Sequence, residues 1–240
     1  EKYTFTIGED GFINVKRDSS GGLSDAILAE GKREFRLNPA KDLTLSESLG
    51  AMGGEYLKVN LVEQDLNANK NSGIIVSDGQ KLELVNLGNA DGSKSAHDFV
   101  SETSGAVVDN SGELIIRNSY FKDNSTKADG GVVNNNEKAS VNIVDSSFVN
   151  NKADGNGGAI NNIGGNVKIT ASDKDVLFSG NTANGKANDI YMANNDDNMA
   201  VVTFDGSKTT TLNGGISGNG TIVKNGSGTL ALGGDNRGFN

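Results

Sequence analysis

Apolar positions in the middle of the chain, between Gly105 and Tyr191, repeat one short pattern about three times. Each copy holds an apolar pair, then two apolar residues separated by one position, then a phenylalanine with an asparagine three residues later. The pairs are Val107–Val108, Val132–Val133 and Ala159–Ile160; the alternating positions are Leu114 and Ile116, Val141 and Ile143, and Val167 and Ile169; the aromatic and amide positions are Phe121 and Asn124, Phe148 and Asn151, and Phe178 and Asn181. Gly105, Gly131 and Gly158 open the copies at spacings of 26 and 27 residues, and the phenylalanines are 27 and 30 residues apart. Such a period is typical of a repeat array.

Alternation within each copy predicts strands, because residues two positions apart face the same side of a strand. Runs of Asn, Asp, Gly and Ser between the strands favour turns. Three strands and three turns in about 27 residues fit one coil of a β-helix, and stacked coils bury apolar faces that one coil leaves exposed. We therefore expect an all-β solenoid with the three phenylalanines stacked inside and the three asparagines in a polar ladder beside them.

The first 42 residues predict an N-terminal cap. Alternating residues in Tyr3–Ile7 and Phe12–Val15 predict a hairpin. Ser24–Ala29 is expected to form a short helix with Ser24 as its N-cap, and Phe35–Leu37 is expected to form a strand. This order resembles the start of right-handed β-helix proteins of the pectate-lyase-like class. The resemblance implies a right-handed parallel β-helix whose open end is plugged by the short helix.

Coils are expected from residue 43 to residue 204. Strands are predicted around Leu43–Leu45, Leu57–Leu61, Ile74–Val76, Leu82–Leu84, Val201–Phe204 and Thr211–Leu212, with Leu49–Gly54 as a loop and Asp78–Gly79 as a turn. Residues 88–104 break the rhythm and predict a loop that projects from the column, where solenoids place variable function.

Residues 205–240 change character, since apolar residues alternate there with Gly, Asn and Ser. The stretch from Asn213 to Asn240 closely resembles the passenger-associated repeat of autotransporters. That resemblance implies a single β-helix domain over residues 1–240, displayed on the surface of a Gram-negative bacterium or secreted from it. It also implies that a membrane-embedded barrel follows further along such a protein.

Two motifs of the repeat carry a second resemblance. Gly130-Gly131-Val-Val and Gly157-Gly158-Ala-Ile resemble the GGA-[ILV] motif of polymorphic outer membrane proteins, and the three Phe-x-x-Asn sequences resemble the FxxN motif of that family. There the motifs are linked to adhesion. If FxxN contacted a ligand directly, Phe121, Phe148 and Phe178 would have to face solvent; we favour the structural interpretation, with Phe inside the coil and Asn bonded to the backbone.

Composition narrows the possible partners. The 240 residues carry a net charge of −9, which argues against binding to nucleic acid or to an anionic membrane. The chain has no Cys, so disulfides, zinc–thiolate sites and thiol nucleophiles are excluded. No run of 18 apolar residues predicts a transmembrane helix.

Candidate catalytic chemistry is sparse. His97 is the single histidine and lies beside Asp98, whereas a serine protease needs Ser, His and Asp together. A polysaccharide lyase or hydrolase of the β-helix class could use carboxylates to hold Ca²⁺ or to act as a pair. The candidates are Asp109, Asp123, Asp129 and Asp145, with Arg117 as a base, and Asp145 and Asn118 are expected to stack on neighbouring coils. The simpler interpretation makes them turn residues.

These observations predict a non-catalytic adhesin or antigen without cofactor or metal. The expected partner is a host-surface protein, a glycan or a second copy of the chain. The polysaccharide lyase or hydrolase is the alternative, and a purely structural stalk is a third possibility.

Overall fold

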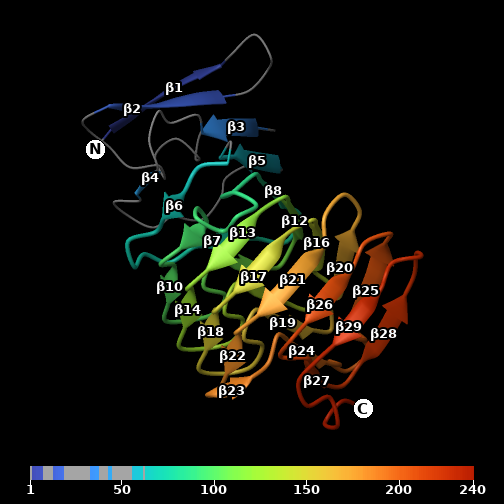
Figure 1. The fold of residues 1–240 in the computed structure, drawn as a ribbon. Coiled ribbons are helices and arrows are strands. Elements are labelled where there is room, and N and C mark those ends of the chain that lie inside the picture. The colour runs from blue at the N-terminus through green and yellow to red at the C-terminus, as the bar shows by residue number, and fades with distance from the viewer. Residues whose placement is uncertain (1, 8–12, 19–32, 38–42, 45–55, 62) are drawn as a thin grey trace.

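The computed structural model describes residues 2–7, 13–18, 33–37, 43–44, 56–61 and 63–240, with side chains described from residue 58 on except at 62. The described chain winds into a column of stacked strands that runs from the N-terminal end to the C-terminal end (Figure 1). The strands form four sheets, here named A to D, and successive turns of the chain add strands to each sheet in order.

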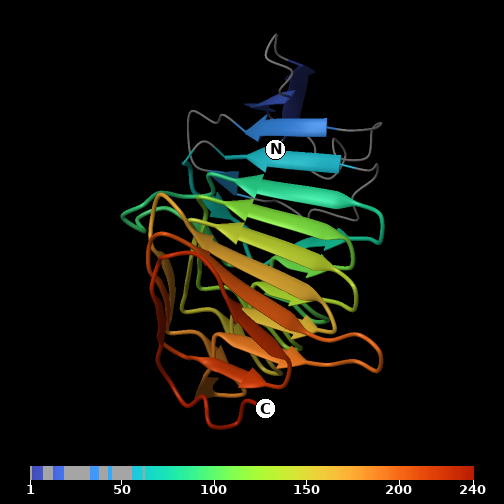
Figure 2. The same ribbon diagram turned by 90° about the vertical axis from the view of Figure 1, so that its right-hand side faces the viewer.

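Sheet A is the longest and runs along the whole column (Figure 2). Its strands, in order, are β1 (Lys2–Ile7), β2 (Ile13–Asp18), β3 (Arg33–Leu37), β5 (Tyr56–Asn60), β8 (Lys81–Val85), β12 (Glu113–Arg117), β16 (Ser140–Val144), β20 (Asn166–Ala171), β25 (Val201–Gly206) and β28 (Thr221–Lys224). Sheet B contains β4 (Leu43–Thr44), β6 (Leu66–Asn67), β9 (Ala96–His97), β13 (Tyr120–Lys122), β17 (Ser147–Val149), β21 (Val176–Ser179), β26 (Thr210–Leu212) and β29 (Leu230–Leu232).

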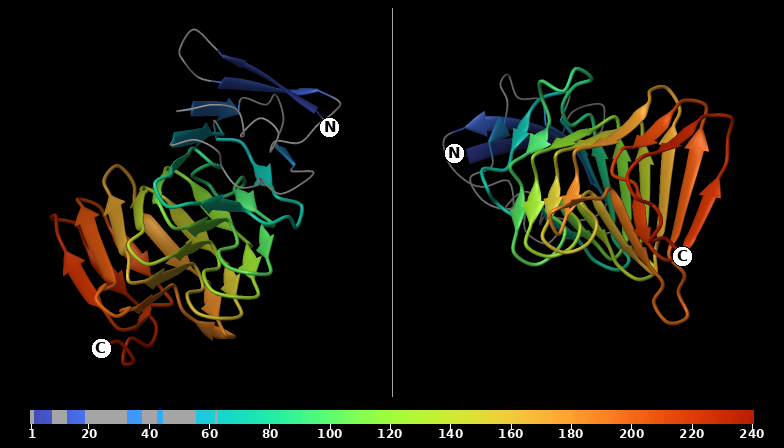
Figure 3. Two further views of the ribbon diagram at one scale, coloured as in Figure 1. Left: turned by 180° about the vertical axis from the view of Figure 1, so that it is seen from behind. Right: turned by 60° about the horizontal axis from the view of Figure 1, so that its bottom comes forward.

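Sheets C and D complete the wall of the column (Figure 3). Sheet C contains β7 (Ile74–Val76), β11 (Val108–Asn110), β15 (Val133–Asn135), β19 (Ile160–Ile163), β24 (Ile190–Ala193) and β27 (Ile216–Gly218), and sheet D contains β10 (Val100–Ser101), β14 (Ser125–Thr126), β18 (Lys152–Ala153), β22 (Thr182–Ala183) and β23 (Lys186–Ala187). The expected three strands per coil become four where sheet D is present, because the two residues after each FxxN motif also pair.

Pairing between strands is parallel, apart from two hairpins in the described part of the chain. The N-terminal hairpin joins β1 to β2, as predicted, and β2 pairs in parallel with β3, so sheet A begins within the first 42 residues. In the second hairpin the chain turns at Asn184-Gly185, so that β23 folds back on β22 at the edge of sheet D. Parallel sheets stacked in this way confirm the β-solenoid architecture.

The register confirms the repeat. Phe121 pairs with Phe148 and Phe148 with Phe178, and the alternating apolar residues of sheet A pair in the same way. One alignment was wrong by a residue. Val108 pairs with Val133, so Gly105 corresponds to Gly130 and not to Gly131. Gly105 and Gly130 also share a left-handed backbone conformation, with φ 58° and φ 76°, which agrees with this alignment.

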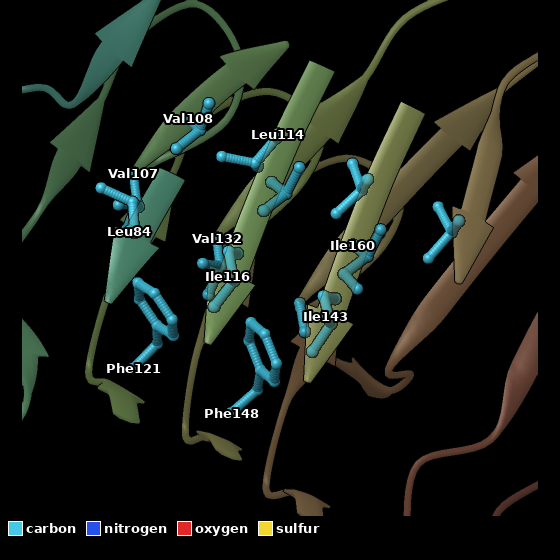
Figure 4. Packing of buried hydrophobic residues seen from close by; sticks show 14 of the residues in the cluster. Leu84, Val107, Val108, Leu114, Ile116, Phe121, Val132, Ile143, Phe148 and Ile160 are labelled. Carbon is cyan, nitrogen blue, oxygen red and sulfur yellow. The ribbon is translucent and has the colours of Figure 1, made fainter. Parts of the chain in front are cut away.

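Stacked side chains of one kind fill the interior (Figure 4). The ring centroids of Phe121 and Phe148 are 5.2 Å apart, and those of Phe148 and Phe178 are 4.6 Å apart, with interplanar angles of 13° and 10°. Leu114 and Ile116 on β12 face the same interior from sheet A and are fully buried. Each coil therefore covers the apolar face of the next.

The double glycines are required by the close approach of neighbouring coils. Gly130 and Gly157 adopt φ 76° and φ 68°, a left-handed conformation that costs other residues free energy. At Gly131, an added Cβ would lie 1.8 Å from the carbonyl oxygen of Gly158, so only glycine fits. The GG motif is thus a packing feature of the turn that leads into sheet C.

The predicted loop at residues 88–104 is partly wrong. Residues 96–97 and 100–101 form β9 and β10, Ala96 pairs with Phe121, and Phe99 is buried. Only the first half of the segment leaves the column. The expected helix at residues 24–29 and the expected loop at residues 49–54 lie outside the described residues.

We predict that Phe148→Ala lowers the free energy of unfolding by about 3–5 kcal/mol, because it opens a cavity in the middle of the ring stack. Val149→Ala, which truncates the adjacent half-buried residue on the outer side of the same strand, is expected to cost less than about 1 kcal/mol. Guanidinium titration of both variants measures the difference. Equal losses would contradict the interior stack.

Candidate functional site

The FxxN motifs lie inside the column. Phe121, Phe148 and Phe178 have at most 1% of their surface exposed, and Asn124, Asn151 and Asn181 have the same upper limit. Side chains buried to this extent contact neighbouring coils and no partner outside the column. The structure therefore gives these residues a packing role, and direct contact with a ligand would require them at the surface.

The three asparagines form a hydrogen-bonded ladder from coil to coil. Asn124 Nδ2 donates to Asn151 Oδ1 and Asn151 Nδ2 donates to Asn181 Oδ1, both at 3.0 Å. Each Oδ1 also accepts the backbone N–H of the asparagine one coil earlier. Each Nδ2 donates in addition to a backbone carbonyl of the preceding coil, at Phe121 for Asn151 and at Phe148 for Asn181. The predicted ladder is present, and the backbone it satisfies belongs to the neighbouring coil.

The ladder ends on a buried carboxylate that the sequence pattern did not indicate. Asn181 Nδ2 donates to Asp189 Oδ1 at 2.8 Å, and the N–H of Gly214 donates to Asp189 Oδ2 at 2.7 Å. Leu212 occupies the next position in the phenylalanine stack, so no further FxxN motif continues the ladder. Burial raises the pKa of the Asp189 carboxyl, and hydrogen bonds from Asn181 and Gly214 oppose that rise.

A second buried ladder was also missed. Asn110 Nδ2 donates to Asn135 Oδ1, and Asn135 Nδ2 donates to Asn162 Oδ1, both at 2.9 Å. These residues end β11 and β15 and lie within β19, and all three have no exposed surface. The sequence does contain a signal for this ladder, because each of these asparagines stands two residues after the second member of an apolar pair.

On the outer side of sheet C, Asp109 begins a third row. Asn134 Nδ2 donates to Asp109 Oδ1 at 3.0 Å, and Asn161 Nδ2 donates to Asn134 Oδ1 at 2.7 Å. Tyr191 follows Asn161 in the register. The Asp109 carboxylate is therefore an acceptor within an amide row and is not paired with a second carboxylate.

Asp145 caps an insertion. It lies one coil after Asn118, and the two residues directly follow strands β16 and β12 of sheet A. Both have positive φ, so they stack as predicted. The third copy carries extra residues 172–175, and Asp145 Oδ1 accepts the N–H of Ser172 at 2.7 Å and that of Lys174 at 3.3 Å. The Ser172 hydroxyl donates to Asp145 Oδ2. A carboxylate satisfied in this way stabilises a turn, which is the simpler of the two interpretations.

The remaining catalytic candidates are dispersed. Arg117 Nε lies 2.9 Å from Glu83 Oε1, Asp129 Oδ1 accepts the N–H of Asn156, and Asp123 lies exposed in a turn with φ 57°. Among the described side chains, no group of three or more His, Asp and Glu residues is placed to hold a metal ion.

His97 is held between two carboxylates. Its Nε2 lies 2.7 Å from Asp65 Oδ2 and its Nδ1 lies 3.2 Å from Asp98 Oδ2. Asp65 Oδ1 also accepts the N–H of Ser95 at 2.9 Å. With both ring nitrogens engaged, His97 links β9 to the preceding coil, and neither nitrogen faces a hydroxyl nucleophile.

Comparisons with models of protein families, with curated protein sequences and with solved structures each return no match to this chain. Within the described residues, none of the elements is a helix with the length and apolar character needed to cross a bilayer.

We predict that Asn151→Ala lowers the free energy of unfolding by about 3 kcal/mol, because it leaves buried donors and acceptors of the two neighbouring coils unpaired. Asn166→Ala removes an exposed amide from β20 and is expected to change stability by less than about 0.5 kcal/mol. Denaturant titration compares the two. A loss at Asn151 no larger than at Asn166 would contradict the ladder.

The raised pKa of Asp189 predicts a pH dependence of stability. Between the ordinary value of 3.8 and the raised folded value, the folded state retains a proton that the unfolded state has lost, so stability falls as pH rises. Asp189→Asn removes this contribution. The free energy of unfolding of the wild type, minus that of Asp189→Asn, should therefore decrease with increasing pH across that window. A difference that is flat or increases with pH would contradict the assignment.

Proposed function

We propose that this chain is a non-catalytic binding column of the autotransporter passenger type, acting as an adhesin or antigen at or beyond the outer surface of a Gram-negative bacterium. The observation that carries the proposal is the use of the repeat motifs. Their aromatic and amide groups hold neighbouring coils together. Of the carboxylates considered for catalysis, Asp109, Asp129 and Asp145 act as acceptors in turns and ladders. What remains for function is the outer surface.

Two resemblances in the sequence support the same proposal. The GG and FxxN motifs resemble those of polymorphic outer membrane proteins, and residues 213–240 resemble the passenger-associated repeat. In that region Ile216 is buried and Ile222 and Leu230 pack against the core, as expected of glycine-rich terminal coils. We accordingly propose a right-handed coil of the pectate-lyase-like class.

The outer surface is suited to contact with a large partner. Strands at regular spacing present rows of side chains along the column, and loops leave it near residues 88–95, 172–175 and 194–199. A host-surface protein, a glycan or a second copy of the chain is the expected partner. No cofactor takes part.

We predict that the purified 240-residue chain binds saturably to epithelial cells, matrix proteins or immobilised glycans and releases no oligosaccharides from polysaccharides. The Phe148→Ala variant serves as a control, because a disrupted column should lose the binding surface. Cleavage of a polysaccharide with release of unsaturated oligosaccharides or new reducing ends, without surface binding, would contradict the proposal and favour the lyase or hydrolase.

A further inference from the structure

The segment between β8 and β9 and the outer face of sheet B together border a hollow of about 190 Å³ that is open to solvent on one side. Asp91 and Ser95 line it from the loop, and Tyr120, Lys122 and Val149 line it from β13 and β17. A volume of this size is below the ~300 Å³ typical of pockets for drug-sized ligands, so it fits a single small ring. Of the Phe, Asn and Gly positions that define the FxxN and double-glycine motifs, only Phe121 contributes to the lining of this hollow.

The loop side of the hollow is fixed before any ligand arrives. Asn89 Oδ1 accepts the N–H of Lys94 at 3.0 Å, and Asn89 Nδ2 donates to the Ser93 hydroxyl at 3.0 Å. Asp91 Oδ1 accepts the N–H of Ser93 at 2.8 Å, and Asp65 anchors the end of the loop through the N–H of Ser95. A site held in this way loses little conformational entropy on binding.

The walls combine an apolar surface with two opposite charges. Tyr120 is half-buried and presents an aromatic ring with a hydroxyl, and Val149 adds an aliphatic surface one coil further along. Lys122 and Asp91 are exposed at the rim. Hydrogen bonds from the side chain and backbone of Ser93 lower the pKa of Asp91, which keeps its carboxylate ionised.

We propose that this hollow is a subsite for one ring of a neutral saccharide, with the C–H face of the ring on Tyr120 and its hydroxyl groups between Asp91 and Lys122. A pyranose has an apolar face and a rim of hydroxyls that both donate and accept. Tyr120 matches the face, the carboxylate accepts from the hydroxyls, and the ammonium donates to them. This inference rests on the proposed function and names the ligand class of one surface.

Charge favours a neutral ligand over an acidic one. Lys122 and Asp91 cancel at the rim, and the chain as a whole carries −9, which repels polyanions. The sheet also offers room for a longer chain of sugars. Tyr120 is followed in the register by Ser147, then by Leu177, whose surface is 37% exposed, and then by Thr211.

Fluorine NMR of the full chain tests the subsite directly. The protein has four tyrosines, so incorporation of 3-fluorotyrosine gives four signals, and Tyr120→Phe identifies the signal of Tyr120. The probes are neutral tetrasaccharides of hexoses and N-acetylhexosamines, with uronic-acid tetrasaccharides for comparison. A neutral saccharide is expected to shift the Tyr120 signal and to leave that of Tyr191, on the outer side of sheet C, in place.

Binding measurements on variants complete the test. Tyr120→Ala should weaken the affinity for the responding saccharide about tenfold or more, and Tyr191→Ala, the matched control, should leave it within about twofold. Asp91→Asn and Lys122→Met should each weaken it about threefold.

Three results would overturn the subsite: no neutral saccharide shifts Tyr120, only acidic saccharides do so, or Tyr120→Ala binds as tightly as Tyr191→Ala. Binding of the wild type and Tyr120→Ala to cells or matrix with equal strength would refute the subsite and leave the proposed function standing. Absence of all surface binding by the wild type would refute both.

Discussion

In-register pairing of parallel strands is the constraint on which this structure depends. It places each side chain against its counterpart one coil away, at about the 4.8 Å spacing of paired strands. A phenylalanine then stacks on a phenylalanine, as at Phe148 and Phe178 with centroids 4.6 Å apart. An asparagine, which has both a donor and an acceptor, bonds its own copies in both directions. Repetition of one sequence thus stabilises the column without a conventional globular core.

The same constraint determines what the ends of each row must do. A row of amides that stops inside a protein leaves one group without its partner, and burial makes that costly. At the end of the FxxN ladder, Asp189 supplies the missing acceptor for Asn181 and also accepts the backbone N–H of Gly214. Where the third copy is longer, the backbone N–H groups of the inserted turn also need acceptors, and the Asp145 carboxylate accepts from them. Both carboxylates support the architecture.

Periodicity was sufficient to predict the stack, the first ladder and the glycine turns, because these features depend on residues that recur. It could not indicate the role of Asp189 or the contacts of Asp145 with the inserted turn, since each of these depends on a residue that occurs once and acts between coils. The alignment of Gly105 failed for a similar reason: an alanine, Ala106, stands at the second glycine position, and only the register distinguishes the two choices. The segment at residues 96–101 looked irregular because its coil has Ala96 where later coils have phenylalanine.

In the proposed function, binding is separated from these rows and takes place on the outer surface. Interior positions are fixed by stacking, so variation is tolerated where the chain leaves the column, as in the loop that carries Asp91. A binding surface of this kind places a preformed hollow on a rigid wall and needs no catalytic group. The adhesin proposal and the saccharide subsite both follow from that division between inner and outer side chains.

Disulfide trapping tests the register most directly, because the chain has no cysteine of its own. Ser147 and Leu177 are paired on the outer side of sheet B, whereas Ser179 pairs with Val149. The account predicts that Ser147→Cys with Leu177→Cys forms a disulfide on mild oxidation and that Ser147→Cys with Ser179→Cys does not. Equal cross-linking of both pairs, or cross-linking of only the second, would contradict the in-register column.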